Sequence, residues 1–81
     1  MIQQIINKGE YIFQGTIQDF KNCISSFKIL EVIHDAEVCG CRVYDCLGKF
    51  RYHGETHSIY IQQHMGGQDI LYITYRGVIN V

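Results

Sequence analysis

Five side chains that can bind metal or act as nucleophiles and bases lie within 19 residues of one another. They follow the pattern C-x-C-x4-C-x6-H-x3-H, made by Cys39, Cys41, Cys46, His53 and His57. Thiolates and imidazoles are the ligands that zinc prefers in proteins. The paired C-x2-C knuckle of structural zinc sites is missing, so we expect no cofactor. A metal-binding or small-ligand-binding domain that uses Cys46, His53 and His57 remains an alternative.

A second kind of chemistry is nucleophilic catalysis, for which Cys46 with His53 or His57 is the candidate pair. Such catalysis needs a nucleophile, a base and an orienting group in one pocket. No signature turn such as G-x-S-x-G frames these residues, and a chain of 81 residues seldom encloses a deep cleft. We therefore expect the protein not to be an enzyme and keep a small enzyme as the last alternative.

The segment Asp45-Cys46-Leu47-Gly48 resembles a type I turn that ends in a left-handed glycine, and it predicts a hairpin with Cys46 exposed at the turn. In that hairpin Arg42 lies opposite Arg51, a like-charge pair that is locally unfavourable. The predicted cationic surface could bind an acidic protein, and it consists of Arg42, Tyr44, Lys49, Arg51 and His53. The alternative is that a carboxylate of Glu31, Asp35 or Glu37 on the neighbouring strand neutralises the pair.

A second hairpin is predicted around Gly66-Gly67, with Ile61 opposite Tyr72 and Tyr60 opposite Ile73. Both faces of this hairpin are then partly apolar, so both must be covered. One short helix covers only one face, so the other needs either closure of the sheet into a barrel or a second chain, and we favour a second copy of this chain. The residues expected at this dimer interface are Tyr60, Leu71, Ile73 and Tyr75.

The elements that position these residues can be predicted from periodicity and capping signals. A helix begins after Thr16, with Asp19 completing a capping box, and its apolar positions continue to Phe27. Two short apolar stretches around Asn7-Lys8-Gly9 suggest an opening hairpin. Strands are expected over 29–34, 37–44, 49–53, 57–64 and 69–75. The fold class is α+β: residues 1–81 form a single domain, with one amphipathic helix packed on a bent antiparallel sheet of five to seven strands.

Composition narrows the function classes. Seven basic against eight acidic residues give a net charge of −1, so we expect no nucleic-acid partner. No apolar run reaches the roughly 20 residues of a membrane helix and no signal peptide is evident, which predicts a cytoplasmic protein without a membrane. The absence of proline leaves sheet edges open to a partner. The sequence predicts a non-catalytic protein-binding module, homodimeric and acting through a Tyr and Arg surface. It resembles in kind the small phage or mobile-element inhibitors and regulators of larger complexes.

Overall fold

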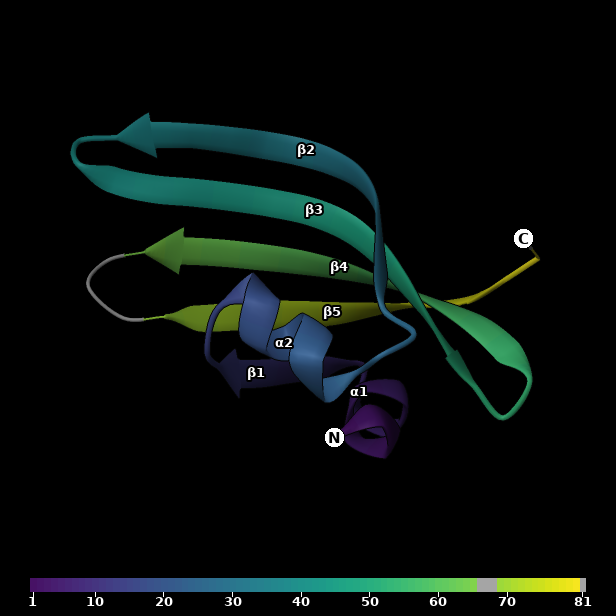
Figure 1. Ribbon diagram of the computed structural model, residues 1–81. Coiled ribbons are helices and arrows are strands. Elements are labelled where there is room, and N and C mark those ends of the chain that lie inside the picture. The colour runs from purple at the N-terminus through teal and green to yellow at the C-terminus, as the bar shows by residue number, and fades with distance from the viewer. Residues whose placement is uncertain (66–68, 81) are drawn as a thin grey trace.

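The computed structural model describes residues 1–65 and 69–80 of the chain. They form an antiparallel sheet with strand order β1-β5-β4-β3-β2, together with two short helices (Figure 1). The elements are α1 (Ile2–Lys8), β1 (Glu10–Gln14), α2 (Ile17–Cys23), β2 (Lys28–Val38), β3 (Cys41–Tyr52), β4 (Glu55–Met65) and β5 (Ile70–Ile79). The predicted α+β class with a bent antiparallel sheet is confirmed, with five strands.

The first segment is the helix α1 and not the first strand of an opening hairpin, so that prediction is wrong. Ile2, Ile5 and Ile6 are three and four residues apart, the spacing that gathers side chains on one helix face. Gly9 ends the helix in a left-handed conformation with φ 79°, and its N–H donates to the carbonyl of Ile5 at 3.0 Å. The turn signal at Asn7-Lys8-Gly9 therefore marks a helix end.

The predicted start of the second helix is confirmed. The N–H of Thr16 donates to Asp19 Oδ2 at 2.9 Å, and the N–H of Asp19 donates to Thr16 Oγ1 at 3.1 Å. This capping box satisfies amides that the helix itself leaves without acceptors. The helix ends at Cys23, which is exposed, while Ile24 and Phe27 stay buried in the following extended segment.

The turn predicted at Asp45–Gly48 does not exist, because these residues lie in the middle of the continuous strand β3. The turns that flank β3 are Cys39-Gly40 and His53-Gly54, where all four residues have positive φ. Gly48 has a packing role instead: a Cβ atom added there would lie 2.8 Å from Cζ of Phe27. Gly48 is therefore needed to make room for the Phe27 ring and does not turn the chain.

The register of β4 and β5 also differs from the prediction, by one residue. Ile61 lies opposite Ile73 and Tyr60 lies opposite Thr74; the predicted Gly66-Gly67 turn itself lies outside the described residues. A one-residue slip changes which side chains share a face. The buried face of this hairpin holds Ile59, Ile61, Leu71 and Ile73, whereas Tyr60 and Tyr72 lie on the other. The hairpin is therefore amphipathic, and burial of its apolar core residues does not need a second copy of the chain on the other face.

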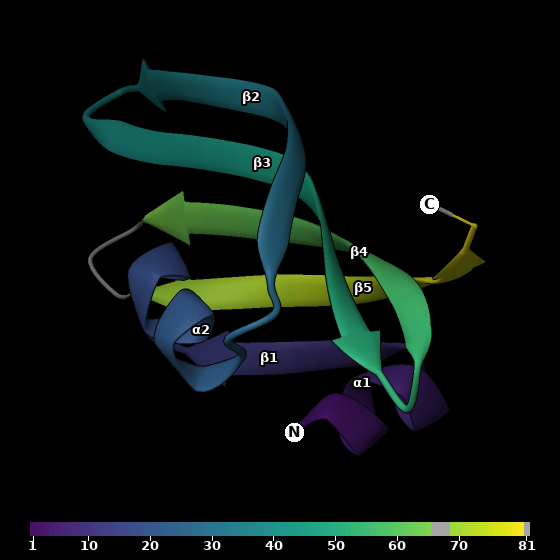
Figure 2. The same ribbon diagram turned by 45° about the vertical axis from the view of Figure 1, so that its right-hand side comes forward.

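Both helices pack on the same face of the sheet, since the core joins Ile5 of α1 and Phe20 of α2 to buried residues of β3, β4 and β5. The remaining core residues are Ile24, Phe27, Cys46, Phe50, Ile59, Ile61, Leu71 and Ile73. The strands curve, and the β2–β3 hairpin extends beyond the helices at one end of a molecule 41 Å long and 21 Å wide (Figures 1 and 2). Among the described residues, no helix has the length and hydropathy needed to cross a bilayer.

Candidate functional site

The structure does not bring the predicted cationic surface together. Arg42 and Arg51 are nine residues apart on the same strand, β3, and do not face each other across a hairpin. At about 3.3 Å per residue this separation is roughly 30 Å, and an odd number of residues places the two side chains on opposite faces. The like-charge pair that suggested a functional cation site is therefore absent.

Arg42 instead pairs with a carboxylate on the neighbouring strand, as the alternative interpretation expected. Its Nη2 atom lies 3.1 Å from Oδ1 of Asp35, and both side chains are about half exposed. An ion pair in that setting contributes little to stability. Tyr44 lies on the same face, where burial raises the pKa of its hydroxyl and the neighbouring Cys46 and Asp35 raise it further. Arg42 and Tyr44 line a shallow hollow of about 350 Å³ beside the start of α2.

Arg51 and His53 lie at the β3–β4 turn and make contacts within it. Arg51 donates from Nη1 to Thr56 Oγ1 at 3.2 Å and from Nη2 to the carbonyl of Gly54 at 3.0 Å. His53 packs its ring edge to face against Tyr52, with the centroids 4.1 Å apart. Lys49, the last member of the predicted surface, lies opposite Lys28 of β2.

The four residues predicted at the dimer interface are split between the two faces of the sheet. Leu71 and Ile73 are 0% and 1% exposed in the core, so neither can contact a partner. The hydroxyl of Tyr75 lies 2.8 Å from Nδ1 of the buried His57. Tyr60 alone lies on the face without helices, where desolvation and then the neighbouring carboxylate of Asp45 raise the pKa of its hydroxyl.

Cys46, His53 and His57 also lie apart. Cys46 is fully buried, and desolvation raises the pKa of its thiol to about 11. His57 lies opposite Phe50, four residues along β3 from Cys46 and therefore roughly 13 Å away. His53 is in the β3–β4 turn. Within residues 1–65 and 69–80, no three His, Cys, Asp or Glu side chains are grouped closely enough to hold a metal ion.

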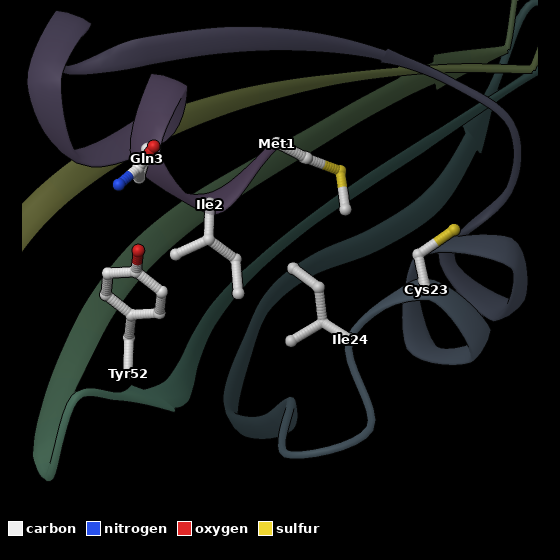
Figure 3. A pocket seen from close by; sticks show the side chains of 6 residues that line it. All are labelled: Met1, Ile2, Gln3, Cys23, Ile24 and Tyr52. Carbon is white, nitrogen blue, oxygen red and sulfur yellow. The ribbon is translucent and has the colours of Figure 1, made fainter.

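A second hollow lies between the start of α1 and the end of α2. Its volume is about 370 Å³, and its lining residues are Met1, Ile2, Gln3, Cys23, Ile24 and Tyr52. Figure 3 shows Ile2 and Ile24 pointing toward each other across it, with the Tyr52 hydroxyl near Gln3. The lining side chains supply one thiol and one phenol, with no carboxylate or imidazole beside them to act as a base.

The most exposed apolar surface is on β2, which the sequence interpretation did not identify as an interaction site. This edge strand has eleven residues, and no other described strand pairs with its outer side. Leu30, Val32, Ile33 and Val38 are 46%, 50%, 50% and 52% exposed. The signal was present in the sequence, since residues 28–38 form one long run without glycine, proline or asparagine that leads into Cys39-Gly40.

Comparison of the chain with protein-family models, curated proteins and solved structures gives no match. Its function is therefore inferred from its own residues.

Proposed function

We propose that this chain is a non-catalytic protein-binding module that forms a homodimer by pairing β2 with β2 of a second copy. The observation that carries the proposal is the eleven-residue edge strand with four exposed large apolar side chains. An exposed edge of this kind presents a row of free N–H and C=O groups, which an added antiparallel strand satisfies. The pairing also removes the exposed apolar side chains from water.

The strand β2 is not regular along its whole length, because its register against β3 shifts between Ile29 and Glu31 and again between Val32 and His34. Val32 lies opposite Cys46, on the face of the sheet that the helices cover. In a two-fold antiparallel pair, the same residue of each copy projects from the same face. A pairing centred on Val32 therefore brings the two half-exposed Val32 side chains together.

The same dimer leaves the helix-free face of the sheet open for a different protein. Tyr72 and Ile12 are 45% and 61% exposed there, and Tyr60 is half-buried beside them. Tyrosine supplies large contact area together with a polar tip, which suits a protein interface. We assign this face to the protein partner of an inhibitor or regulator that occupies the surface of a larger complex.

The test places a charge at the centre of the proposed pairing. Val32→Lys sets two like charges beside each other in the dimer and should weaken dimerisation about tenfold or more. Sedimentation equilibrium measures the dissociation constant of each protein, and circular dichroism confirms that each variant is folded.

The matched control is Ile12→Lys, which makes an equivalent change at an exposed residue of β1, at the opposite edge of the sheet. It should leave the dissociation constant unchanged. A wild-type chain that stays monomeric at its highest soluble concentration would contradict the homodimer. A Val32→Lys variant that dimerises as tightly as the wild type would contradict pairing through β2.

A further inference from the structure

The tip of the β2–β3 hairpin carries two accessible thiols. Cys39 and Cys41 lie on either side of Gly40, and both are exposed. The hairpin tip is at the far end of the molecule from α1, beyond the part of the sheet that the helices cover (Figure 1). Neither thiol contributes to the hydrophobic core, so packing does not explain a pair of cysteines at this turn.

The turn fixes the two cysteines close together. Val38 pairs with Cys41, which leaves a two-residue loop, and positive φ angles of 52° at Cys39 and 78° at Gly40 make it a type I′ turn. A residue in this tight conformation sets the Cα atoms on either side of it about 5.5 Å apart, as in one step of a helix. Cα atoms joined through a disulfide usually lie about 4.4–6.8 Å apart.

We propose that Cys39 and Cys41 form a reversible dithiol–disulfide pair whose substrates are small disulfides of the glutathione class. One cysteine thiolate attacks a sulfur of the small disulfide, forming a mixed disulfide and releasing one small thiolate, which takes up the proton that the cysteine lost. The second cysteine thiolate then attacks the mixed disulfide on the protein sulfur. That step forms the Cys39–Cys41 bond and releases the second small thiol. The protein dithiol loses two electrons and two protons, and the small disulfide gains both.

The small ring makes this bond easy to reverse. A disulfide that spans a single intervening residue closes a strained ring, and strained or exposed disulfides are the readily reduced ones. Cys23 is exposed as well, but it is the last residue of α2 and not part of the hairpin tip. Cys46 is buried under that layer. The chain therefore has one thiol pair suited to exchange and two cysteines that stay reduced or react singly.

The experiment treats the full chain with oxidised glutathione and measures intact mass. Wild type and Cys23→Ser should both lose two hydrogen atoms at the tip, with Cys39 and Cys41 linked in the peptide map. Cys39→Ser and Cys41→Ser cannot complete the second attack, so each should hold one glutathione on the remaining tip cysteine. Reduced glutathione in excess should return the wild type to the dithiol form.

Two results would overturn the proposal. One is a wild type that carries separate glutathiones on Cys39 and Cys41, since two neighbouring thiols then fail to close the ring. The other is a tip disulfide that links two chains, seen as a covalent dimer on a non-reducing gel. The self-association tested by Val32→Lys is measured without oxidant, so either result leaves the homodimer proposal to its own experiment.

Discussion

The two turns that flank β3 have the same backbone but different surroundings. Cys39 and His53 have φ angles of 52° and 50°, and the glycines that follow them have 78° and 79°. At the His53-Gly54 end, Arg51 donates to the carbonyl of Gly54, and Tyr52 packs on the His53 ring. At the Cys39-Gly40 end, residues 37–42 are all exposed.

The backbone of a two-residue X-Gly turn is thus set by its own residues. The contacts that its side chains make depend on where the turn lies in the fold. One end of β3 lies near α1 (Figure 2). At that end Phe50 belongs to the core and stacks on His57. The other end projects as an arm that carries exposed apolar residues and two thiols. The proposed β2 pairing and thiol exchange both belong to the projecting end, whereas the packing of Phe50 in the core belongs to the other end.

The largest expected difference between the two ends comes from removing one apolar side chain at each. Phe50→Ala empties a fully buried site and should lower the free energy of unfolding by about 3–5 kcal/mol. Val38→Ala removes a side chain that is 52% exposed and should change it by less than about 0.5 kcal/mol. Urea unfolding of both variants, at a concentration where the chain is monomeric, measures the contrast. Equal losses would show that the arm is as tightly packed as the core end.

Substitutions of Gly40 and Gly54 test whether the two turns differ in stability although their backbone angles are the same. Gly40→Ala and Gly54→Ala each place a Cβ in a left-handed conformation, with no described atom within 4 Å to clash with it. Each should therefore cost about 1–2 kcal/mol in the free energy of unfolding, from conformational strain alone. A clearly larger loss at Gly54, measured in the same urea experiment, would show that the Arg51 contact depends on the glycine geometry.

The smallest effect is confined to alkaline pH and concerns Cys46. The pKa of its thiol in the folded chain is raised from the usual 9.0 to about 11, chiefly by desolvation. Because the folded pKa is the higher one, the stability that this thiol contributes is fully present below pH 9 and is lost as the pH rises toward 11. Cys46→Ala should reduce this alkaline loss, as followed by thermal melts across that range, and the raised pKa values of Tyr44 and Tyr60 should leave a remainder. A melt of the wild type that is insensitive to pH there would contradict the assignment.

The sequence predicted the features of this fold that depend on neighbouring residues. The Thr16 and Asp19 capping box is one, because both side chains act within a single turn of chain. Gly48 shows the limit: a glycine can turn the chain or admit a ring, and only Phe27, 21 residues away in sequence, decides which. The prediction that Cys46 is exposed at a turn failed with it.

The candidate site was harder to predict than the fold because it depends on register. A shift of one residue between β4 and β5 moved Tyr60 away from Leu71 and Ile73, and with it the predicted interface. The exposed apolar residues of β2 were visible in the sequence as strand formers. Their position on an edge could be known only from the strand order, in which β2 is last.

The strand at the opposite edge sets the size of any assembly. β1 has only five residues, against eleven in β2. Two copies joined through β2 would present β1 at both ends of a ten-stranded sheet, and a strand that short is a poor template for further growth. In such a dimer, addition of further copies would stop at two, because the long open edge that could start a fibre would already be used in the pairing.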